Sequence, residues 1–355
     1  MKVIFRVDSA SHMGGGHLMR CLSLAEALRD HSVQIRFICR ELSGNLISLL
    51  QSKNFSVSVL PPPLVNQVKP TDDYGAWLGV SQAEDASQTL EALGDERPEW
   101  LVVDHYGLGV VWEKALRSYC ERIMVIEDLA NRQHDCDVLI DQNYSLLSKL
   151  RYNSLVPKTC QVLLGPSYAL LRKEFQLLRQ YQTSRSSTLK QLLVFFTTGD
   201  DQGETLKALK GIAIFGKPVK VDVVIGKVNS DAFSIKALCR EKNWGYHCQI
   251  DYMPSLISMA DLVIGAGGSS NWERCALGVP ALVSVLVENQ SQIVQSLDSA
   301  GVVHNLGKSH CLQASDYADA LHGLNHAHLS SMSEKAKAMV DAKGHERVAA
   351  ILIAA

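Results

Sequence analysis

Residues 14–20 read GGGHLMR and join a strand-like run, KVIFRVDSA at 2–10, to a helix-like run, CLSLAEALRD at 21–30. The first run is apolar and β-branched, and the second spaces its apolar residues as an amphipathic helix does. The glycines therefore predict a tight strand-to-helix turn whose backbone can approach a ligand closely. His17 follows at the helix start, where free N–H groups favour an anion. The stretch predicts a phosphate group near a titratable side chain.

The composition narrows the class of protein. The chain has 355 residues, more than one hydrophobic core usually serves, so we expect two domains. Its formal net charge of −2 provides no basic field for nucleic acid or anionic lipid. No apolar run reaches the ~18 residues that span a bilayer, and the opening MKVIFRVD predicts a strand rather than a signal peptide. Nine cysteines without a CxxC pair indicate reduced thiols, so we expect a cytoplasmic protein. From the charge and the lack of a long apolar run, we expect that it binds neither nucleic acid nor membrane.

Strand-like and helix-like runs alternate through the first half of the chain. WLVVDHY at 100–106 and RIMVIEDLA at 122–130 are separated by the amphipathic run VVWEKALRSYC at 110–120. This alternation is typical of a parallel sheet covered by helices, and such sheets bind ligands at the carboxyl ends of their strands. Polar residues gather at these predicted ends, namely Asp8, Asp104, His105, Tyr106, Glu127, Asp128, Asp141, Gln142 and Asn143.

A second alternation follows a polar segment. Residues 181–190, YQTSRSSTLK, carry no apolar period and predict a linker. Strand-like runs then recur from QLLVFFTTG at 191–199 onward, again separated by helix-like runs. We therefore predict two αβα domains, 1–180 and 187–355, with a cleft between them.

A second glycine turn lies in DLVIGAGGSSNWERCALGVPAL at 261–282. An apolar strand-like run leads into the glycines, and Ser269 or Ser270 can cap the helix that follows. Gly278, followed by Val-Pro, is typical of a helix C-terminus. Glu273 has two interpretations that the sequence leaves open. It is either the capping partner of the serine or a carboxylate that binds the vicinal hydroxyls of a ribose.

The two turns together indicate a class of ligand. Neither is GxGxxG followed about 20 positions later by an acidic residue, and neither is GxxxxGK[ST]. These mismatches argue against a dinucleotide fingerprint and an ATPase P-loop. Facing each other across a cleft, the turns predict a nucleotide-sugar site. The second turn takes the diphosphate and ribose, and the first takes the sugar.

Several blocks resemble one enzyme family. FRVDSASHMGGGHLMRCLSLAEAL, VVDHYG, VLIDQN, LLGPSYALLRKEF, GAGGSSNWERCALGVP and ENQ occur in this order between residues 5 and 290. They resemble the UDP-sugar hydrolases of pseudaminic acid biosynthesis, whose substrate is UDP-2,4-diacetamido-2,4,6-trideoxy-β-L-altropyranose. The opening block and the GPSYALLRKEF block are specific to that family. The GAGG block is shared with GT-B glycosyltransferases of the MurG type, so it supports UDP-sugar binding rather than hydrolysis in particular.

This resemblance implies the GT-B fold, with two Rossmann-like αβα domains, and loss of UDP without metal or cofactor. Water attacks the anomeric carbon, the C–O bond is cleaved and the configuration inverts. His17 matches the catalytic histidine of the family. The implied sugar side comprises Arg6, Asp8, Gly14, Gly15, Gly16, Tyr106 and Asn143. The implied UDP side comprises Gly267, Gly268, Ser269 and Glu273, with Asn289 and Gln290 near sugar or phosphate.

Two positions depart from the family pattern. An asparagine precedes the matching glutamate directly in some members, but here Trp272 holds that position and Asn271 lies one earlier. We therefore do not predict a catalytic asparagine. The run FFTTGDD at 195–201 keeps a turn but has one glycine fewer than the usual FGG-x-D. That difference weakens the case for phosphate contacts there.

Histidine chemistry suits this reaction. UDP is a stable leaving anion, so one base that activates water can suffice where ordinary glycosidases use two carboxylates. Histidine titrates near neutral pH and fits that role. Asp8 is a candidate to orient the His17 imidazole. The structural alternative is a helix-start histidine hydrogen-bonded to the backbone.

Other interpretations stay open beside the hydrolase. A GT-B glycosyltransferase would need an acceptor surface, and a non-catalytic UDP-sugar-binding protein would have no need of a base at position 17. A metal site at residues 104–106, or at His322, His326 and His328, is less favoured than ordinary solvated side chains. We expect Arg172 and Glu174 to form a helix ion pair. The tail 341–355 predicts an amphipathic helix that packs on the first domain, and we expect a monomer.

Overall fold

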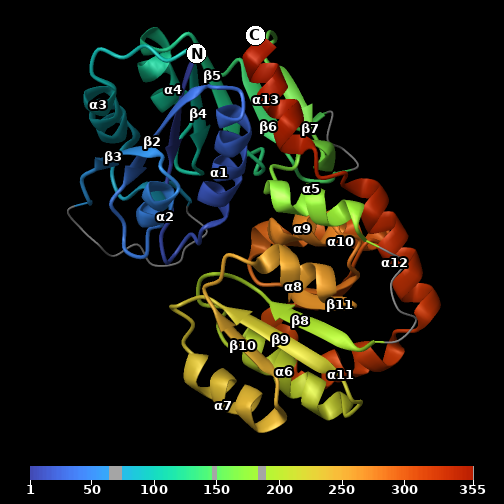
Figure 1. The fold of residues 1–355 in the computed structure, drawn as a ribbon. Coiled ribbons are helices and arrows are strands. Elements are labelled where there is room, and N and C mark those ends of the chain that lie inside the picture. Colours follow the sequence, from blue (N-terminus) through green and yellow to red (C-terminus); the bar gives the residue numbers. More distant parts are fainter. Residues whose placement is uncertain (64–73, 146–149, 183–188, 355) are drawn as a thin grey trace. The chain divides into compact units, whose positions relative to one another are not determined.

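The computed structural model describes residues 1–63, 74–145, 150–182 and 189–354. The chain forms two compact units, Met1–Leu171 with Lys343–Ala355, and Arg172–Ala342. Each unit contains one parallel sheet flanked by helices (Figure 1). The predicted α/β fold class is confirmed. Residues 183–188 of the predicted linker lie outside the described residues.

The division between the units lies earlier than the boundary predicted at 180–187. Helix α5 (Lys173–Gln180) groups with the second unit, where it packs on α8 (Met253–Met259) and α9 (Ser270–Ala276). Arg179 of α5 donates hydrogen bonds to the backbone carbonyls of Ala276 and Lys337, each at 2.7 Å. These contacts attach α5 to the unit that follows it in the chain.

The first unit has seven parallel strands in the order β3-β2-β1-β4-β5-β6-β7. Their bounds are β1 Lys2–Val7, β2 Gln34–Arg40, β3 Ser56–Leu60, β4 Trp100–Asp104, β5 Arg122–Ile126, β6 Val138–Asp141 and β7 Gln161–Leu164. The chain builds outward from β1 in one direction and from β4 in the other, so the strand order reverses between these two. Ligands of such sheets bind where the order reverses, at the carboxyl ends of the two strands.

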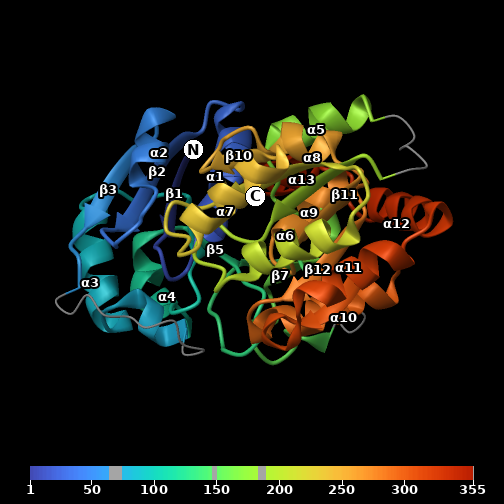
Figure 2. The ribbon, with the colours of Figure 1, turned by 90° about the horizontal axis from the view of Figure 1, so that it is seen from below.

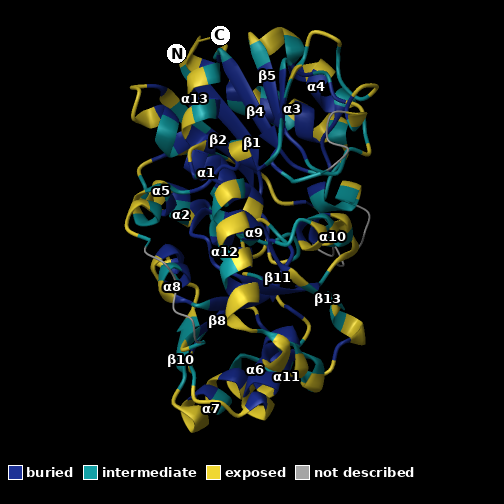
Figure 3. Cartoon of the chain, turned by 90° about the vertical axis from the view of Figure 1, so that its right-hand side faces the viewer, coloured by how far each residue is buried: buried dark blue, intermediate teal, exposed yellow. Residues whose placement is uncertain are grey.

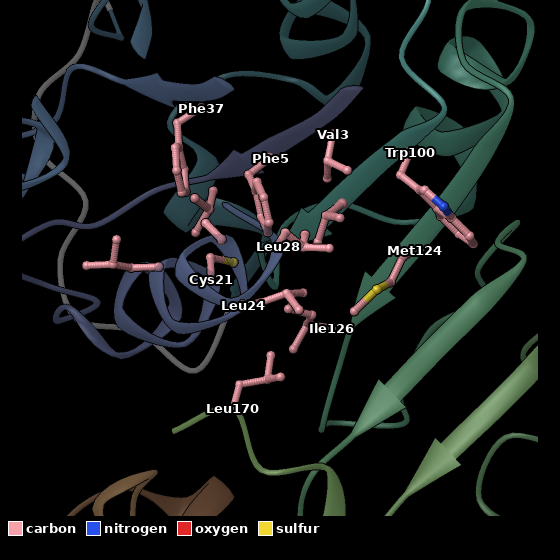
Figure 4. Close-up of a cluster of buried hydrophobic side chains, with 14 of the residues drawn as sticks. Val3, Phe5, Cys21, Leu24, Leu28, Phe37, Trp100, Met124, Ile126 and Leu170 are labelled. Carbon is pink, nitrogen blue, oxygen red and sulfur yellow. The ribbon is translucent and has the colours of Figure 1, made fainter. Parts of the chain in front are cut away.

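Helices cover both faces of this sheet. Successive apolar side chains along each strand point to opposite faces, so both faces must be buried. Those in the first unit are α1 Gly16–Arg29, α2 Ile47–Ser52, α3 Gln82–Leu93, α4 Val110–Leu116 and α13 Gly344–Ala354, with 3-10 turns η1 Tyr74–Leu78, η2 Arg117–Tyr119 and η4 Pro166–Tyr168. Val3 and Phe5 of β1 pack with α1 residues on one face, whereas Ile4 packs toward α3 and α4 on the other. Figure 2 shows α3 and α4 side by side. Figure 4 shows the α1 face, where the Phe5 and Phe37 rings stack with centroids 4.9 Å apart.

The C-terminal helix belongs to the first unit. α13 packs against α1, and both appear side by side in Figure 1. The indole of Trp100, which is 1% exposed, donates its N–H to the carbonyl of Leu352 at 3.0 Å. A Cβ on Gly344 would lie 2.3 Å from the carbonyl oxygen of Ala169, so the helix start requires glycine. The tail therefore completes the core of the first unit, as its amphipathic pattern indicates.

The second unit has six parallel strands in the order β10-β9-β8-β11-β12-β13. Their bounds are β8 Gln191–Phe195, β9 Lys220–Ile225, β10 Gly245–Cys248, β11 Leu262–Ala266, β12 Ala281–Val285 and β13 His304–Lys308. The remaining elements are α6 Glu204–Phe215, α7 Ala232–Lys242, η5 Glu288–Gln290, α10 Ser291–Ser299, η6 Ser309–Cys311, α11 Ala314–Gly323 and α12 His326–Met339. The order reverses between β8 and β11. The central strands of both sheets are buried, as Figure 3 shows for β1 and β4.

We searched the helices of the described residues for one that could cross a membrane. None of their helices combines the length and the apolar character that crossing a bilayer requires.

Candidate active site

The first glycine turn lies directly beyond the carboxyl end of β1, at the point where the strand order reverses. Gly14 has φ +74°, a conformation that favours glycine, and its N–H donates to the carbonyl of Ala10 at 2.8 Å. Gly15 is the N-cap of α1, and Gly16, which is exposed, is the first helical residue. The first turn of α1 holds no acidic side chain, so its positive end is not compensated there.

His17 is the second residue of α1 and is 8% exposed. The edge of its ring meets the ring of Tyr106, with centroids 4.5 Å apart and planes at 79°. Its buried Nδ1 has no hydrogen-bond partner among the described residues, which disfavours the structural alternative of a backbone-bonded histidine. Burial lowers the pKa of His17, with Arg20 adding to the effect while Asp104 and Asp128 oppose it. The imidazole is therefore neutral at neutral pH, as a general base must be.

A chain of buried charges holds Tyr106 beside His17. Arg20 donates hydrogen bonds to both carboxylate oxygens of Asp104, at 2.6 and 2.7 Å, and to Oδ2 of Asp128 at 3.1 Å. The other oxygen of Asp128 accepts a 2.6 Å hydrogen bond from the Tyr106 hydroxyl. Because Arg20 lies one helical turn after His17, one helix places both the candidate base and the cation that orders its surroundings.

Asp8 has partners other than His17. Its Oδ1 accepts hydrogen bonds from Arg6 Nη1 and from the backbone N–H of Arg40, both at 2.6 Å. Its Oδ2 lies 3.6 Å from Nε2 of His105. The described contacts include no bond from Asp8 to His17, and the carboxylates that act on the His17 pKa are Asp104 and Asp128. The structure therefore does not support the expectation that Asp8 orients His17.

His105 is a buried neutral side chain that faces Asp8. Its Nδ1 accepts a hydrogen bond from the N–H of Gly107 at 2.9 Å, so the neutral ring carries its hydrogen on Nε2. Burial lowers the pKa of His105 to about 4, against the pull of Asp8. The ring thus directs an N–H toward the Asp8 carboxylate.

Arg6 belongs to a fully buried network. It donates to both oxygens of Asp85, at 3.1 and 2.5 Å, and Arg40 donates to Asp85 Oδ2 at 2.6 Å. Although burial opposes a charge, Asp8 and Asp85 raise the pKa of Arg6 well above its usual value. Since its side chain has no exposed surface, Arg6 contributes to the site by holding Asp8.

Asn143 lies at the carboxyl end of β6, next to the carboxylate of Asp141. Its backbone N–H donates to Asp141 Oδ1 at 2.9 Å, and Arg151 and the Tyr152 hydroxyl reach Asp141 Oδ2 at 2.6 and 3.0 Å. Burial and the charge of Asp128 raise the pKa of Asp141 to about 7. The backbone of Asn143 is therefore fixed, while its side chain is half-buried.

The glycine turn of the second unit follows β11 and is closely packed. A Cβ on Gly265 would lie 2.2 Å from the carbonyl oxygen of Phe195, and one on Gly267 would lie 2.1 Å from Cγ2 of Val294. Gln290 lies beside the turn, with Nε2 3.8 Å from the position of a Cβ on Gly268. Its Oε1 accepts the backbone N–H of Leu286 at 3.0 Å.

The structure thus brings Gly267, Gly268 and Gln290 together, while Asn289 lies exposed one residue before Gln290. Ser269 is the N-cap of α9 but makes no side-chain capping bond, so the capping-box interpretation of Glu273 is wrong. Burial raises the pKa of Glu273, with Arg172 and Arg274 opposing. Gly278 has φ +60° just beyond α9, which confirms the predicted C-terminus.

The positions that depart from the family pattern, Asn271, Trp272 and the TTGD turn, have contacts within the second unit. Asn271 is buried and accepts a hydrogen bond from Arg274, and Trp272 is 1% exposed. In the TTGD turn, the N–H of Gly199 donates to Thr197 Oγ1 at 3.1 Å, and Asp201 accepts the N–H groups of Gly203 and Thr205 at 3.1 and 3.3 Å. The Asp201 carboxylate thus binds backbone N–H groups at the start of α6, whose N-cap is Gly203.

Sequence reasoning missed several residues around His17 and Arg6, namely Arg20, Arg40, Tyr74, Trp77 and Asp85. Arg20 had a usable signal, because it lies three positions after His17 on the same predicted helix. Asp85 had none, since it reaches Arg6 across 79 positions of sequence. Among the described residues, no group of three or more His, Cys, Asp and Glu is arranged to hold a metal ion.

The chain matches no protein-family model. It is 30% identical over 200 residues to UDP-2,4-diacetamido-2,4,6-trideoxy-beta-L-altropyranose hydrolase of Campylobacter jejuni, a match that covers 56% of this chain and 60% of that protein. It is 24% identical over 300 residues to an uncharacterized protein of Methanocaldococcus jannaschii, covering 82% of this chain and 57% of that one. It is 22% identical over 312 residues to the spore coat polysaccharide biosynthesis protein SpsG of Bacillus subtilis, covering 86% and 84%. The chain thus spans less than two thirds of the first two relatives.

Solved structures show the same architecture. MurG of Acinetobacter baumannii superposes with a TM-score of 0.69 at 14% identity, covering 100% of this chain and 99% of MurG. The calicheamicin glycosyltransferase CalG4 superposes with a TM-score of 0.63 at 15% identity, covering 99% and 97%. The chain therefore has the GT-B fold, and its resemblance in sequence to the UDP-2,4-diacetamido-2,4,6-trideoxy-beta-L-altropyranose hydrolases is confirmed.

Proposed function

We propose that this chain hydrolyses UDP-2,4-diacetamido-2,4,6-trideoxy-β-L-altropyranose to the free sugar and UDP. The observation that carries the proposal is the state of His17. Burial keeps this imidazole neutral, its Nδ1 has no partner among the described residues, and it follows a glycine turn at the carboxyl end of β1. A neutral imidazole in that place can take a proton from water.

The proposed reaction is one displacement. An unprotonated nitrogen of His17 accepts a proton from water while the water oxygen bonds to the anomeric carbon. The anomeric C–O bond breaks and its electron pair leaves with UDP, so the configuration inverts. UDP is already a stable anion, so the leaving group needs no second acid. We propose no metal and no cofactor.

Each glycine turn has its own part in this proposal. The sugar lies at the first turn, where Asp8, Tyr106 and Asn143 supply polar groups. UDP binds at the second turn, where the N–H groups of Gly267 and Gly268 face the diphosphate and Glu273 takes the ribose hydroxyls. The missing capping bond at Ser269 supports this assignment, because it leaves the hydroxyl and Glu273 available for a ligand. Asn289 and Gln290 complete this side.

A second candidate is a GT-B glycosyltransferase with a UDP-sugar donor. MurG and CalG4 have this fold. The GAGG block also resembles that of GT-B glycosyltransferases. A non-catalytic UDP-sugar-binding protein is a third candidate. We propose a cytoplasmic monomer for the hydrolase, in keeping with the cysteine content of the chain.

UDP release without an acceptor separates these candidates. The UDP-linked diacetamido sugar is incubated with the wild type, His17→Phe and the control His326→Phe, which alters an exposed histidine on α12, all in EDTA. The hydrolase releases UDP by many turnovers in the wild type and control, and by roughly 10²- to 10⁴-fold less in His17→Phe. UDP binding without release would contradict the proposal, and release that depends on an added acceptor would establish a transferase.

A further inference from the structure

A group of aromatic rings lies beside His17, and the proposed reaction uses only the Tyr106 hydroxyl of this group. Tyr74 and Trp77 lie on η1, with ring centroids 4.9 Å apart at 89°. The Tyr106 ring lies 5.7 Å from Trp77 and 5.1 Å from Tyr74. Trp77 also lies 6.4 Å from the His17 ring and 6.0 Å from the His12 ring. We call Tyr74, Trp77 and Tyr106 the aromatic wall.

The aromatic wall is not part of the hydrophobic cores described above. Its three side chains are half-buried, and none belongs to the clusters on either face of the first sheet. Three partly exposed rings that lie together beside a candidate base form a contiguous apolar surface, and such surfaces mark ligand-binding grooves.

The wall is nevertheless held firmly. Leu78, the neighbour of Trp77, is 1% exposed within the core on the α3 and α4 face and anchors η1. A Cβ on Gly107 would lie 3.1 Å from the carbonyl oxygen of Tyr74, so the backbone of η1 lies close against the segment after β4. Asp128 holds the Tyr106 hydroxyl at 2.6 Å. The rings therefore present a fixed surface beside the candidate base.

We infer that Trp77, supported by Tyr74, binds the apolar substituents of the sugar and so determines which sugar the enzyme accepts. This inference rests on the proposed function. The proposed substrate carries a methyl group at C6 and two acetamido methyl groups in place of hydroxyls. Aromatic faces bind such groups well, whereas a hydroxymethyl group at C6 loses hydration against the same surface. Packing on Trp77 holds the anomeric carbon near His17 and favours the deoxy sugar over its hydroxylated relatives.

The test compares Trp77→Ala with Trp244→Ala, which alters a half-buried tryptophan in the second unit. Calorimetry measures binding of the free diacetamido-trideoxy sugar and of UDP separately. Steady-state assays compare its UDP-linked form with UDP-N-acetylglucosamine. We expect Trp77→Ala to weaken binding of the free sugar roughly tenfold and to raise KM for the deoxy substrate similarly. UDP affinity stays unchanged, and the preference over UDP-N-acetylglucosamine shrinks. Trp244→Ala behaves as the wild type.

Trp77→Phe supplies a second measurement that keeps a ring in place and preserves folding. Sugar binding should quench tryptophan fluorescence in the wild type and in Trp244→Phe, and this quenching should be absent in Trp77→Phe. Unchanged sugar affinity in Trp77→Ala, or an equal loss of sugar and UDP affinity, overturns the inference while the hydrolase stands. A wild type that neither binds the sugar nor releases UDP overturns the proposed function, and the inference with it.

Discussion

The glycine turn after β1 and the glycine turn after β11 both join a buried strand to a helix, but their surroundings differ. Around the first lie a neutral histidine, partly exposed aromatic rings and buried ion pairs such as Arg20 with Asp104. Around the second lie close backbone and aliphatic contacts, including those that would clash with a Cβ on Gly265 or Gly267. In the proposed function, the first turn serves proton transfer and the second serves backbone recognition of an anion.

The two turns also lie at different places relative to the sheet. Each sheet reverses its strand order once, between β1 and β4 in the first unit and between β8 and β11 in the second. The first turn follows β1, whereas the second follows β11, the fourth strand of its sheet. The counterpart of the GGGH turn in the second unit is the TTGD turn after β8. It is followed by Asp201, whose carboxylate accepts the backbone N–H groups of Gly203 and Thr205. The two glycine-rich turns thus follow strands that hold different places in their sheets, and the side chains around each turn differ accordingly.

The largest effect should come from the buried charges beneath the first turn. Asp85→Ala leaves Arg6 and Arg40 without their shared carboxylate, in a place with no exposed side-chain surface. Arg6 keeps Asp8, but Arg40 loses its buried carboxylate partner. Breaking a buried ion pair costs about 3–5 kcal/mol, so we expect the free energy of unfolding to fall by that amount. Urea unfolding followed by tryptophan fluorescence measures it, since Trp112 also donates to Asp85, at 2.9 Å. Glu84→Ala, at the exposed neighbour, is the control and should change stability by no more than about 0.5 kcal/mol. Equal losses in both variants would contradict a special role for the buried network.

The second turn should depend on packing instead. Gly267→Ala places a methyl group 2.1 Å from Val294, whereas at Gly268 the nearest atom lies 3.8 Å away. We expect Gly267→Ala to lose about 1–3 kcal/mol of stability and to weaken UDP binding, since the turn must shift. Gly268→Ala, the matched control, should retain the stability of the wild type. Thermal unfolding with and without UDP measures both effects. If the two alanines are equally tolerated, the turn is not close-packed as described.

The pH dependence of kcat/KM sharpens the assignment of the base. Because burial lowers the pKa of His17, the imidazole stays unprotonated until the pH falls below the usual value of about 6.5. Activity should therefore be constant down to that pH and fall below it as His17 gains a proton. A rate profile between pH 4.5 and 8 measures the midpoint. A midpoint at or above 6.5 would contradict a buried neutral base.

The smallest expected effect is the difference in stability between two serine-to-alanine variants, one at a helix cap and one at the proposed UDP site. Ser81 caps α3 by accepting the N–H of Glu84 at 3.1 Å, whereas Ser269 makes no capping bond. Ser81→Ala should therefore cost about 1 kcal/mol of stability, and Ser269→Ala should cost close to none while it weakens UDP binding. Chemical unfolding and UDP titration of both variants test this difference. A loss of stability in Ser269→Ala equal to that in Ser81→Ala would restore the capping interpretation.

Much of the fold is predictable because the signals are local. Apolar alternation identifies the central strands, and the glycine turns identify where helices start. β13 and β7 lack such a signal, because HNLGK carries no apolar period and QVLL is too short to distinguish from a loop or a helix. The boundary between the units is misplaced because α5 joins the second unit through Arg179, whose partners are distant in sequence.

The site is predictable in part for the same reason. The sequence singles out His17 by its turn and Glu273 by its position after the second turn, and their roles stay predictions. Trp77 beside Tyr106 and Asp85 beside Arg6 are not predictable in this way, because both reach the site from the segment between β3 and β4. Their approach depends on the strand order, in which β1 and β4 are neighbours while β2 and β3 lie outside them.

The most direct test of the account is the fate of the oxygen from water. The UDP-linked diacetamido-trideoxy sugar is hydrolysed by the wild type in H₂¹⁸O with EDTA, and the products are analysed by mass spectrometry at early times. Attack at the anomeric carbon predicts ¹⁸O in the sugar and none in UDP. Label in the β-phosphate of UDP would show cleavage of the P–O bond and would contradict the central claim that His17 activates water at carbon.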